Sequence, residues 1–172
     1  DCEVSISPNC CVIYEEKPLF TTVSELLRYS VERTKYLFGE ELKILLSEKE
    51  EQYLGASLER IFIEERIYKD KAFEEAADEA TALEHIAKRI EPFADRFLRP
   101  VTTDDLRRLL ELRMARILRF NLPKHEAALL QIEQDMAQLR HDIAHLTDYT
   151  IRWYQHLIQR YGAAFPRRTK IT

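Results

Sequence analysis

The sequence has little glycine and proline, and their positions leave two long stretches uninterrupted. Its 172 residues include 3 glycines and 6 prolines. No proline lies between Pro18 and Pro92 or between Pro123 and Pro166. Because a proline in a helix interior costs about 3 kcal/mol, both spans can form long helices. The intervening prolines, Pro92, Pro100 and Pro123, indicate that the chain turns in its middle.

The cysteines, the lack of long apolar runs and the net charge further limit the class of function. The cysteines Cys2, Cys10 and Cys11 form neither a disulfide framework nor a C-x-x-C pair, which favours the reducing cytoplasm. No run reaches 18 apolar residues and no signal peptide opens the sequence, so no membrane partner is expected. The 26 basic and 30 acidic residues give a formal charge of −4, which argues against strong autonomous DNA binding.

Residues 1–20 are expected to be the end of a preceding domain, because the sequence lacks an initiator Met and opens in an apparent strand. Val4 and Ile6 alternate with polar residues, Pro8 and Asn9 indicate a turn, and residues 11–14 form a second strand-like run. A two-stranded ribbon alone is marginal in water, so these strands are predicted to pair with material upstream.

Two long helices are predicted to form an antiparallel coiled-coil hairpin, a mainly α fold. The first, within the segment 21–67, begins at a capping box formed by Thr22 and Glu25. The second, over 123–162, carries apolar residues spaced alternately by three and four, as in a left-handed coiled coil. These residues are Leu129, Ile132, Met136, Leu139, Ile143, Leu146, Thr150, Trp153 and Leu157. The similar lengths of the two helices predict that they pair along a stalk.

Residues 68–122 are predicted to form a small helical tip. An amphipathic helix is expected over 73–90, and another follows Thr102 or Thr103. The second of these has more apolar residues than one narrow stripe, since Leu112 and Met114 lie off its main face. A helix that is apolar on two sides needs two partners, which are either the rest of the tip alone or the tip and a second copy.

The sequence offers only weak candidates for catalytic and metal-binding residues. His141 and His145 are four residues apart and Asp148 follows, as in a helical zinc site, but all three fall on the solvated side of the seam. A metal-dependent hydrolase using them is one alternative. Acidic residues at 48, 50 and 51 are better interpreted as a solvated helix face. A C-terminal basic cluster indicates a linker or a phosphate contact: Arg167, Arg168 and Lys170.

Five stretches, in order along the whole chain, resemble the A subunit of bacterial type IIA DNA topoisomerases, nearer topoisomerase IV than gyrase. They are DCEVSISPN at 1–9, SLERIFIE at 57–64, LLELR at 109–113, HLTDY at 145–149 and RRT at 167–169. The resemblance implies that 1–20 ends a tower domain and that 163–172 returns toward a C-terminal domain. It also implies that the tips of two copies meet at an exit gate.

The family's DNA-cleaving tyrosine follows an arginine in a winged-helix domain. Arg28-Tyr29 and Arg160-Tyr161 share only that dipeptide, so neither is predicted to be catalytic. The resemblance assigns ATP hydrolysis and magnesium to a partner B subunit. We therefore expect no catalytic, cofactor or metal residue in this segment, and no activity from it alone, although the parent protein would be an ATP-dependent type II topoisomerase.

The sequence thus predicts a gate segment of a DNA breakage–reunion subunit that passes one duplex through another. Its expected partners are a second copy, through the tip, and, in the parent complex, DNA and the B subunit. The dimer interface is predicted to comprise Leu106, Leu109, Leu110, Leu112, Arg113, Met114 and Ile117. The alternative is a coiled-coil adaptor with no DNA role, whose seam pairs with a foreign helix.

Overall fold

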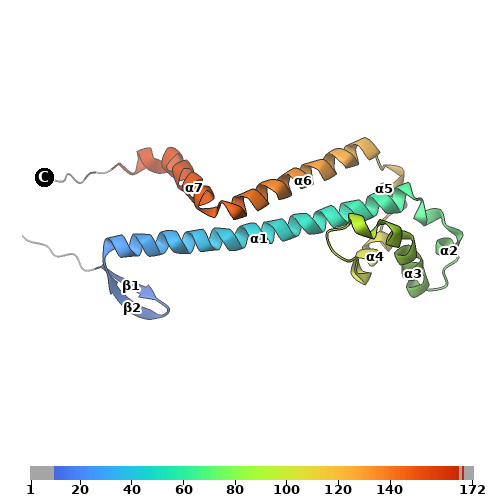
Figure 1. Ribbon diagram of the computed structural model, residues 1–172, viewed down its shortest axis with the longest axis horizontal. Helices are drawn as coiled ribbons and strands as arrows, with labels where there is room; N and C mark the ends of the chain where they lie inside the picture. The colour runs from blue at the N-terminus through green and yellow to red at the C-terminus, as the bar shows by residue number, and fades with distance from the viewer. Residues whose placement is uncertain (1–9, 167, 169–172) are drawn as a thin grey trace, which may run out of the picture. The chain divides into compact units, whose positions relative to one another are not determined.

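The computed structural model describes residues 10–166 and 168, and the fold is mainly helical with one small β-hairpin (Figure 1). The strand predicted at Val4 and Ile6, the turn at Pro8-Asn9, and Arg167 and Lys170 lie outside the described residues. The described chain belongs to two compact units. Unit 1 comprises Asp1–Leu42 with Asp142–Thr172, and unit 2 comprises Lys43–His141.

The β-hairpin of unit 1 pairs β1 (Cys10–Tyr14) with β2 (Lys17–Thr21) in antiparallel register, so the strand predicted over 11–14 is confirmed. Its described partner lies downstream, which the sequence did not predict. The turn is Glu15-Glu16, and both residues have positive φ, 47° and 63°. This conformation suits a two-residue hairpin but normally favours asparagine or glycine, so the sequence carries no turn signal here.

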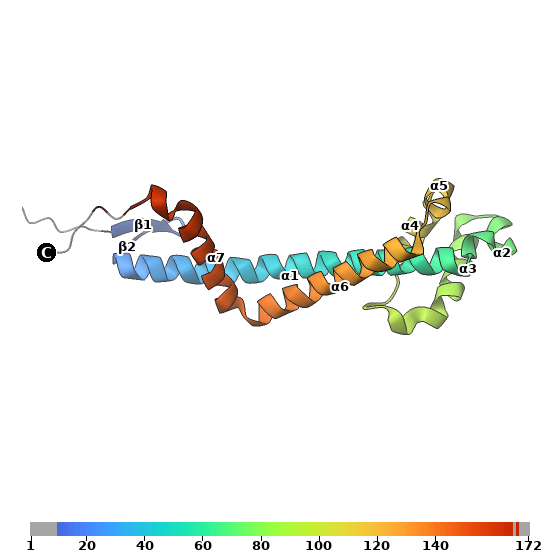
Figure 2. The same ribbon diagram turned by 90° about the horizontal axis from the view of Figure 1, so that it is seen from above.

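The long helix α1 (Val23–Glu64) begins as predicted, at the Thr22 capping box. The Glu25 backbone N–H donates to Thr22 Oγ1 at 3.3 Å, and the Thr22 N–H donates to Glu25 Oε2 at 3.0 Å. These bonds satisfy two of the amide groups that a helix start leaves unpaired. Within unit 1 the hairpin lies at the start of α1 in both views, with the rings of Tyr14 and Tyr29 4.9 Å apart (Figures 1 and 2).

The helix predicted over 123–162 is two helices, α6 (Leu122–Ala144) and α7 (Leu146–Tyr161). They are separated by His145, whose φ of −116° and ψ of 45° are not helical. No proline or glycine lies near the interruption, so local backbone chemistry does not explain it. In unit 1 Leu146 packs closely on α1, because a Cβ added to Gly39 would lie 3.1 Å from Leu146 Cδ2. The break places Leu146 in this contact.

The coiled-coil seam is present in both units. In unit 1, α7 meets α1 at Phe38, whose ring lies 5.5 Å from Tyr149 and 5.1 Å from Trp153. In unit 2, α6 runs antiparallel to α1 (Figure 1), and the seam residues Leu129 and Met136 are buried. Three ion pairs and one hydrogen bond between α1 and α6 flank this seam: Lys49–Asp135, Glu50–Arg140, Tyr53–Glu133 and Arg60–Glu126.

The tip in unit 2 consists of short helices that share a core with the end of α1. After α1 come a 3₁₀ turn (Ile67–Lys69), α2 (Lys71–Glu74), α3 (Glu79–Ile90) and a second 3₁₀ segment (Glu91–Arg96). The helices α4 (Thr103–Leu110) and α5 (Met114–Leu118) follow. The core residues are Leu54, Leu58, Phe62, Ile67, Leu83, Ile86, Ile90, Leu106, Leu109 and Ile117. The core of the tip therefore includes the end of α1.

Candidate self-association surface on the tip

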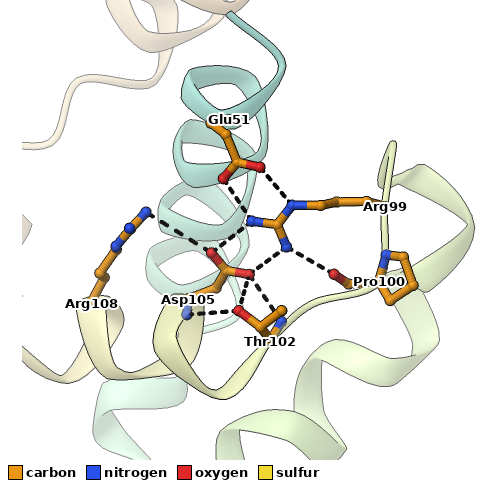
Figure 3. Close-up of polar contacts among 6 residues, drawn as sticks. All are labelled: Glu51, Arg99, Pro100, Thr102, Asp105 and Arg108. Atoms are coloured by element: carbon orange, nitrogen blue, oxygen red, sulfur yellow. Dashed lines mark hydrogen bonds and ion pairs between the residues drawn. The ribbon is translucent and has the colours of Figure 1, made fainter. Parts of the chain in front are cut away.

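Arg99 lies in the connector between the second 3₁₀ segment and α4, and its hydrogen bonds link this connector to the long helix α1 (Figure 3). Its Nε and Nη2 donate to the two carboxylate oxygens of Glu51 at 2.7 and 2.6 Å. Its Nη1 donates to Asp105 Oδ2 at 2.7 Å and to the Pro100 carbonyl at 2.9 Å. One guanidinium thus joins α1, the connector and α4. A planar fork with five N–H donors suits such bidentate contacts, which a lysine could not reproduce.

Asp105 is both the partner of Arg99 and part of the cap of α4. The Thr102 N–H donates to Asp105 Oδ2 at 2.9 Å, and the Asp105 N–H donates to Thr102 Oγ1 at 3.4 Å. The Asp105 side chain is only 7% exposed. Hydrogen bonds from Arg99, and then from Thr102, lower its pKa to about 2, against the opposing effect of burial. Asp105 therefore stays ionised, and the direction of α4 is fixed relative to Arg99.

A second guanidinium fastens α5 to α1. Arg116 donates from Nε and Nη2 to the carboxylate of Glu59 at 2.5 and 2.6 Å. The Glu59 side chain is 11% exposed, whereas that of Arg116 is 66% exposed. The carboxylate is therefore held inside the tip while the arginine lies over it, and the pKa of Arg116 is raised mainly by this hydrogen bonding. Removing Arg116 would leave a nearly buried charge without its partner.

The helix expected after Thr102 is interrupted between α4 and α5. Arg113 has an extended backbone, with φ −71° and ψ 138°. In a continuous helix Leu112 would lie about 120° around the axis from Leu106, given the 3.6-residue period. The interruption lets Leu112 pack against the same core that buries Leu106 and Leu109. This core contact removes the reason for assigning Leu112 to a separate apolar face.

The residues predicted for the dimer interface divide into three groups by exposure. Leu106, Leu109 and Ile117 are buried in the tip core. Leu110 and Leu112 are half-buried and pack against that core. Arg113 and Met114 are exposed, and Met114 is 55% exposed.

The structure identifies one exposed apolar residue that the predicted interface omits. Leu118 is 80% exposed on α5. It follows Met114 by four residues, so the two side chains share one face of α5. The sequence pattern grouped Leu118 with the core-facing stripe, and only the break before Met114 changes that assignment.

The other candidates have structural explanations. Glu50 and Glu51, from the acidic cluster, form ion pairs with Arg140 and Arg99. His141, His145 and Asp148 are exposed, as predicted. Among the described residues, no three or more His, Cys, Asp or Glu side chains gather to hold a metal ion. Within residues 10–166 and 168, no helix is long and apolar enough to cross a membrane.

Comparison with known proteins gives one informative similarity. The chain is 26% identical over all 172 residues to the A subunit of DNA topoisomerase 4 from Borreliella burgdorferi. It spans about a quarter of that protein's length, 27%. No protein-family model matches the chain. The similarity covers both the long helices and the tip, so it concerns about a quarter of that A subunit.

Proposed function

We propose that this chain is the stalk and exit-gate segment of the DNA breakage–reunion subunit of an ATP-dependent type II DNA topoisomerase. The observation that carries the proposal is the similarity, along the entire chain, to the A subunit of a topoisomerase 4. The tip meets the tip of a second copy, while DNA and the B subunit are partners in the parent complex. The segment acts mechanically and cleaves no DNA by itself.

The way the tip is attached supports a mechanical role. Arg99 and Arg116 each join a tip element to a carboxylate on α1, Glu51 and Glu59 respectively. The tip core also includes α1 residues from Leu54 to Phe62. A movement of this part of α1 would therefore carry the tip with it. Such coupling is what a gate operated from a distant cleavage site requires.

The exposed face of α5 supports self-association. Met114 and Leu118 are 55% and 80% exposed on one side of a helix that Arg116 anchors to α1. Burying two such side chains on each protomer contributes a few kcal/mol at about 25 cal/mol per Å². A contact of this size is weak enough to release, as passage of a duplex demands.

The adaptor alternative is less well supported, because the α6 seam already has a partner in its own chain. Leu129 and Met136 are buried, and ion pairs from Lys49 and Arg60 of α1 flank the same seam. A foreign helix would have to displace α1 from these contacts. The seam therefore supports a stalk and gives an adaptor no free surface in unit 2.

Sedimentation equilibrium of the 172-residue chain tests the gate. We expect a dimer whose dissociation constant rises at least about tenfold in Met114→Asp/Leu118→Asp, because each copy would place two charges in an apolar contact. The matched control is Leu130→Asp on α6, since Leu130 is also 55% exposed but lies outside the tip. A monomeric wild-type chain, or a dimer that the α5 double variant leaves intact, would refute the proposal.

A further inference from the structure

A cavity of about 570 Å³ lies where α5 is joined to the start of α6. Four cationic side chains line it, from Arg113, Arg116, Arg119 and Lys124, and Glu59 is its acidic residue. The wall is completed by Ala115, Phe120, Asn121, His125 and Ala128. The lining therefore carries three more positive than negative charges, although the whole chain has a formal charge of −4. We call this cavity the basic pocket.

The positive charge of the basic pocket is largely unneutralised. Arg116 is paired with Glu59. Among residues 10–166 and 168, no ion pair is formed by the remaining three cations, Arg113, Arg119 and Lys124. Arg107, by contrast, is paired with Glu79 and Asp104. Three cations without an acidic partner therefore line one cavity.

His125 is part of the wall of the basic pocket. Its Nδ1 atom is buried and has no hydrogen-bond partner within the described part of the chain. The ring stacks on Phe120 at 4.9 Å between centroids. Burial lowers the pKa of His125 and so favours the neutral imidazole. A buried polar atom without a partner costs free energy.

The position of α6 adds a smaller contribution. The helix begins at Leu122, and the Lys124 N–H donates to Asn121 Oδ1 at 3.0 Å. Asn121, Lys124 and His125 all line the pocket. The positive end of the α6 dipole therefore faces the same cavity as the cationic side chains, and both favour an anion.

We infer that the basic pocket binds a phosphoanion, with Arg113, Arg119 and Lys124 as its charged donors. The volume exceeds that of one phosphate, so the fitting ligand carries adjacent phosphates or a phosphate with an attached group. Two sources have this chemistry, a free diphosphate and the backbone of a nucleic acid. The inference stands on the lining residues and not on the proposed function, because neither Met114 nor Leu118 lines the basic pocket.

Isothermal titration calorimetry at low salt, with inorganic pyrophosphate as the probe, tests the inference on the 172-residue chain. We expect one saturable site that Arg119→Gln/Lys124→Gln weakens about a hundredfold, taking about tenfold for each charge-assisted hydrogen bond. Both side chains are exposed, so the double variant should fold. The control is Lys71→Gln/Lys88→Gln, which removes two exposed lysines of unit 2 that do not line the pocket.

A short DNA duplex is titrated in parallel to distinguish the two sources. Duplex binding that is lost in Arg119→Gln/Lys124→Gln and displaced by pyrophosphate identifies a nucleic-acid backbone, whereas pyrophosphate binding alone identifies a free anion. In either case the imidazole NMR signals of His125 should shift on binding in the control variant and not in the pocket variant. Absence of binding by both probes, or equal binding by both double variants, overturns the inference.

Discussion

The contribution of Asp105 to the stability of the tip is open to a quantitative test. Its pKa is lowered from 3.8 to about 2 by Arg99 and Thr102. At about 1.4 kcal/mol for each pKa unit, the ionised carboxylate stabilises the folded state by about 2 kcal/mol. The side chain is 7% exposed, so solvent screening takes little from this figure. Asp105→Asn should therefore destabilise the tip by about 2 kcal/mol at neutral pH.

The direction of the pKa shift determines how the effect of Asp105→Asn on stability depends on pH. A carboxylate with a lowered folded pKa stabilises the protein above its unfolded pKa, and this stabilisation is lost as the pH falls through the folded value. The difference between wild type and Asp105→Asn should therefore be complete at pH 5 and shrink between about pH 4 and pH 2. Glu51 also has a lowered pKa, mainly because Arg99 hydrogen-bonds to it, and it is present in both proteins.

Urea denaturation followed by NMR measures the loss of stability within unit 2. The methyl signals of Ile86, which is fully buried in the tip core, report on unit 2. Trp153, the one tryptophan of the sequence, lies on α7 in unit 1, so its fluorescence reports whether the loss of stability is confined to unit 2. A destabilisation that is equal at pH 5 and pH 2 would refute the charge-based reasoning and assign the effect to packing.

Two further predictions concern packing, and urea denaturation checks both. Gly55→Ala should stabilise the protein by about 1 kcal/mol, because alanine favours helix and an added Cβ meets nothing within 4 Å. Gly39→Ala should stabilise it less, since the added Cβ would lie 3.1 Å from Leu146. Equal gains would contradict the close packing at Gly39. Ile86→Ala should lower the free energy of unfolding by about 3–4 kcal/mol. Leu98→Ala should lower it by less than about 1 kcal/mol, because Leu98 is 51% exposed. Similar losses would mean that the tip core is misplaced.

The long helices and their pairing could be predicted because the signals are local and periodic. The Thr22 capping box begins α1 as expected. The three-four spacing of Leu129 and Met136 identifies the face of α6 that is buried. Each of these inferences needs only neighbouring residues and the helical period.

The features that could not be predicted depend on tertiary packing. The helix breaks at Arg113 and His145 contain no proline or glycine, and the turn at Glu15-Glu16 has no turn signal. Ion pairs such as Arg99 with Glu51 join residues 48 positions apart, and no local pattern encodes them. For the same reason the sequence did not distinguish Leu109, which the fold buries in the core, from the exposed Met114; their place in a dimer interface stays a prediction.

The relative strength of the contacts decides where a gate of this kind would open. The tip core holds ten buried apolar residues, among them Leu58 and Ile86, and each contributes about 1.5–3 kcal/mol on burial. Loss of either guanidinium, Arg99 or Arg116, would in addition leave a carboxylate buried without its partner, at about 3–5 kcal/mol. The proposed contact between copies rests on far less apolar surface. Under a pulling force it would therefore separate first, and the tip would stay folded on α1, so the gate could close again.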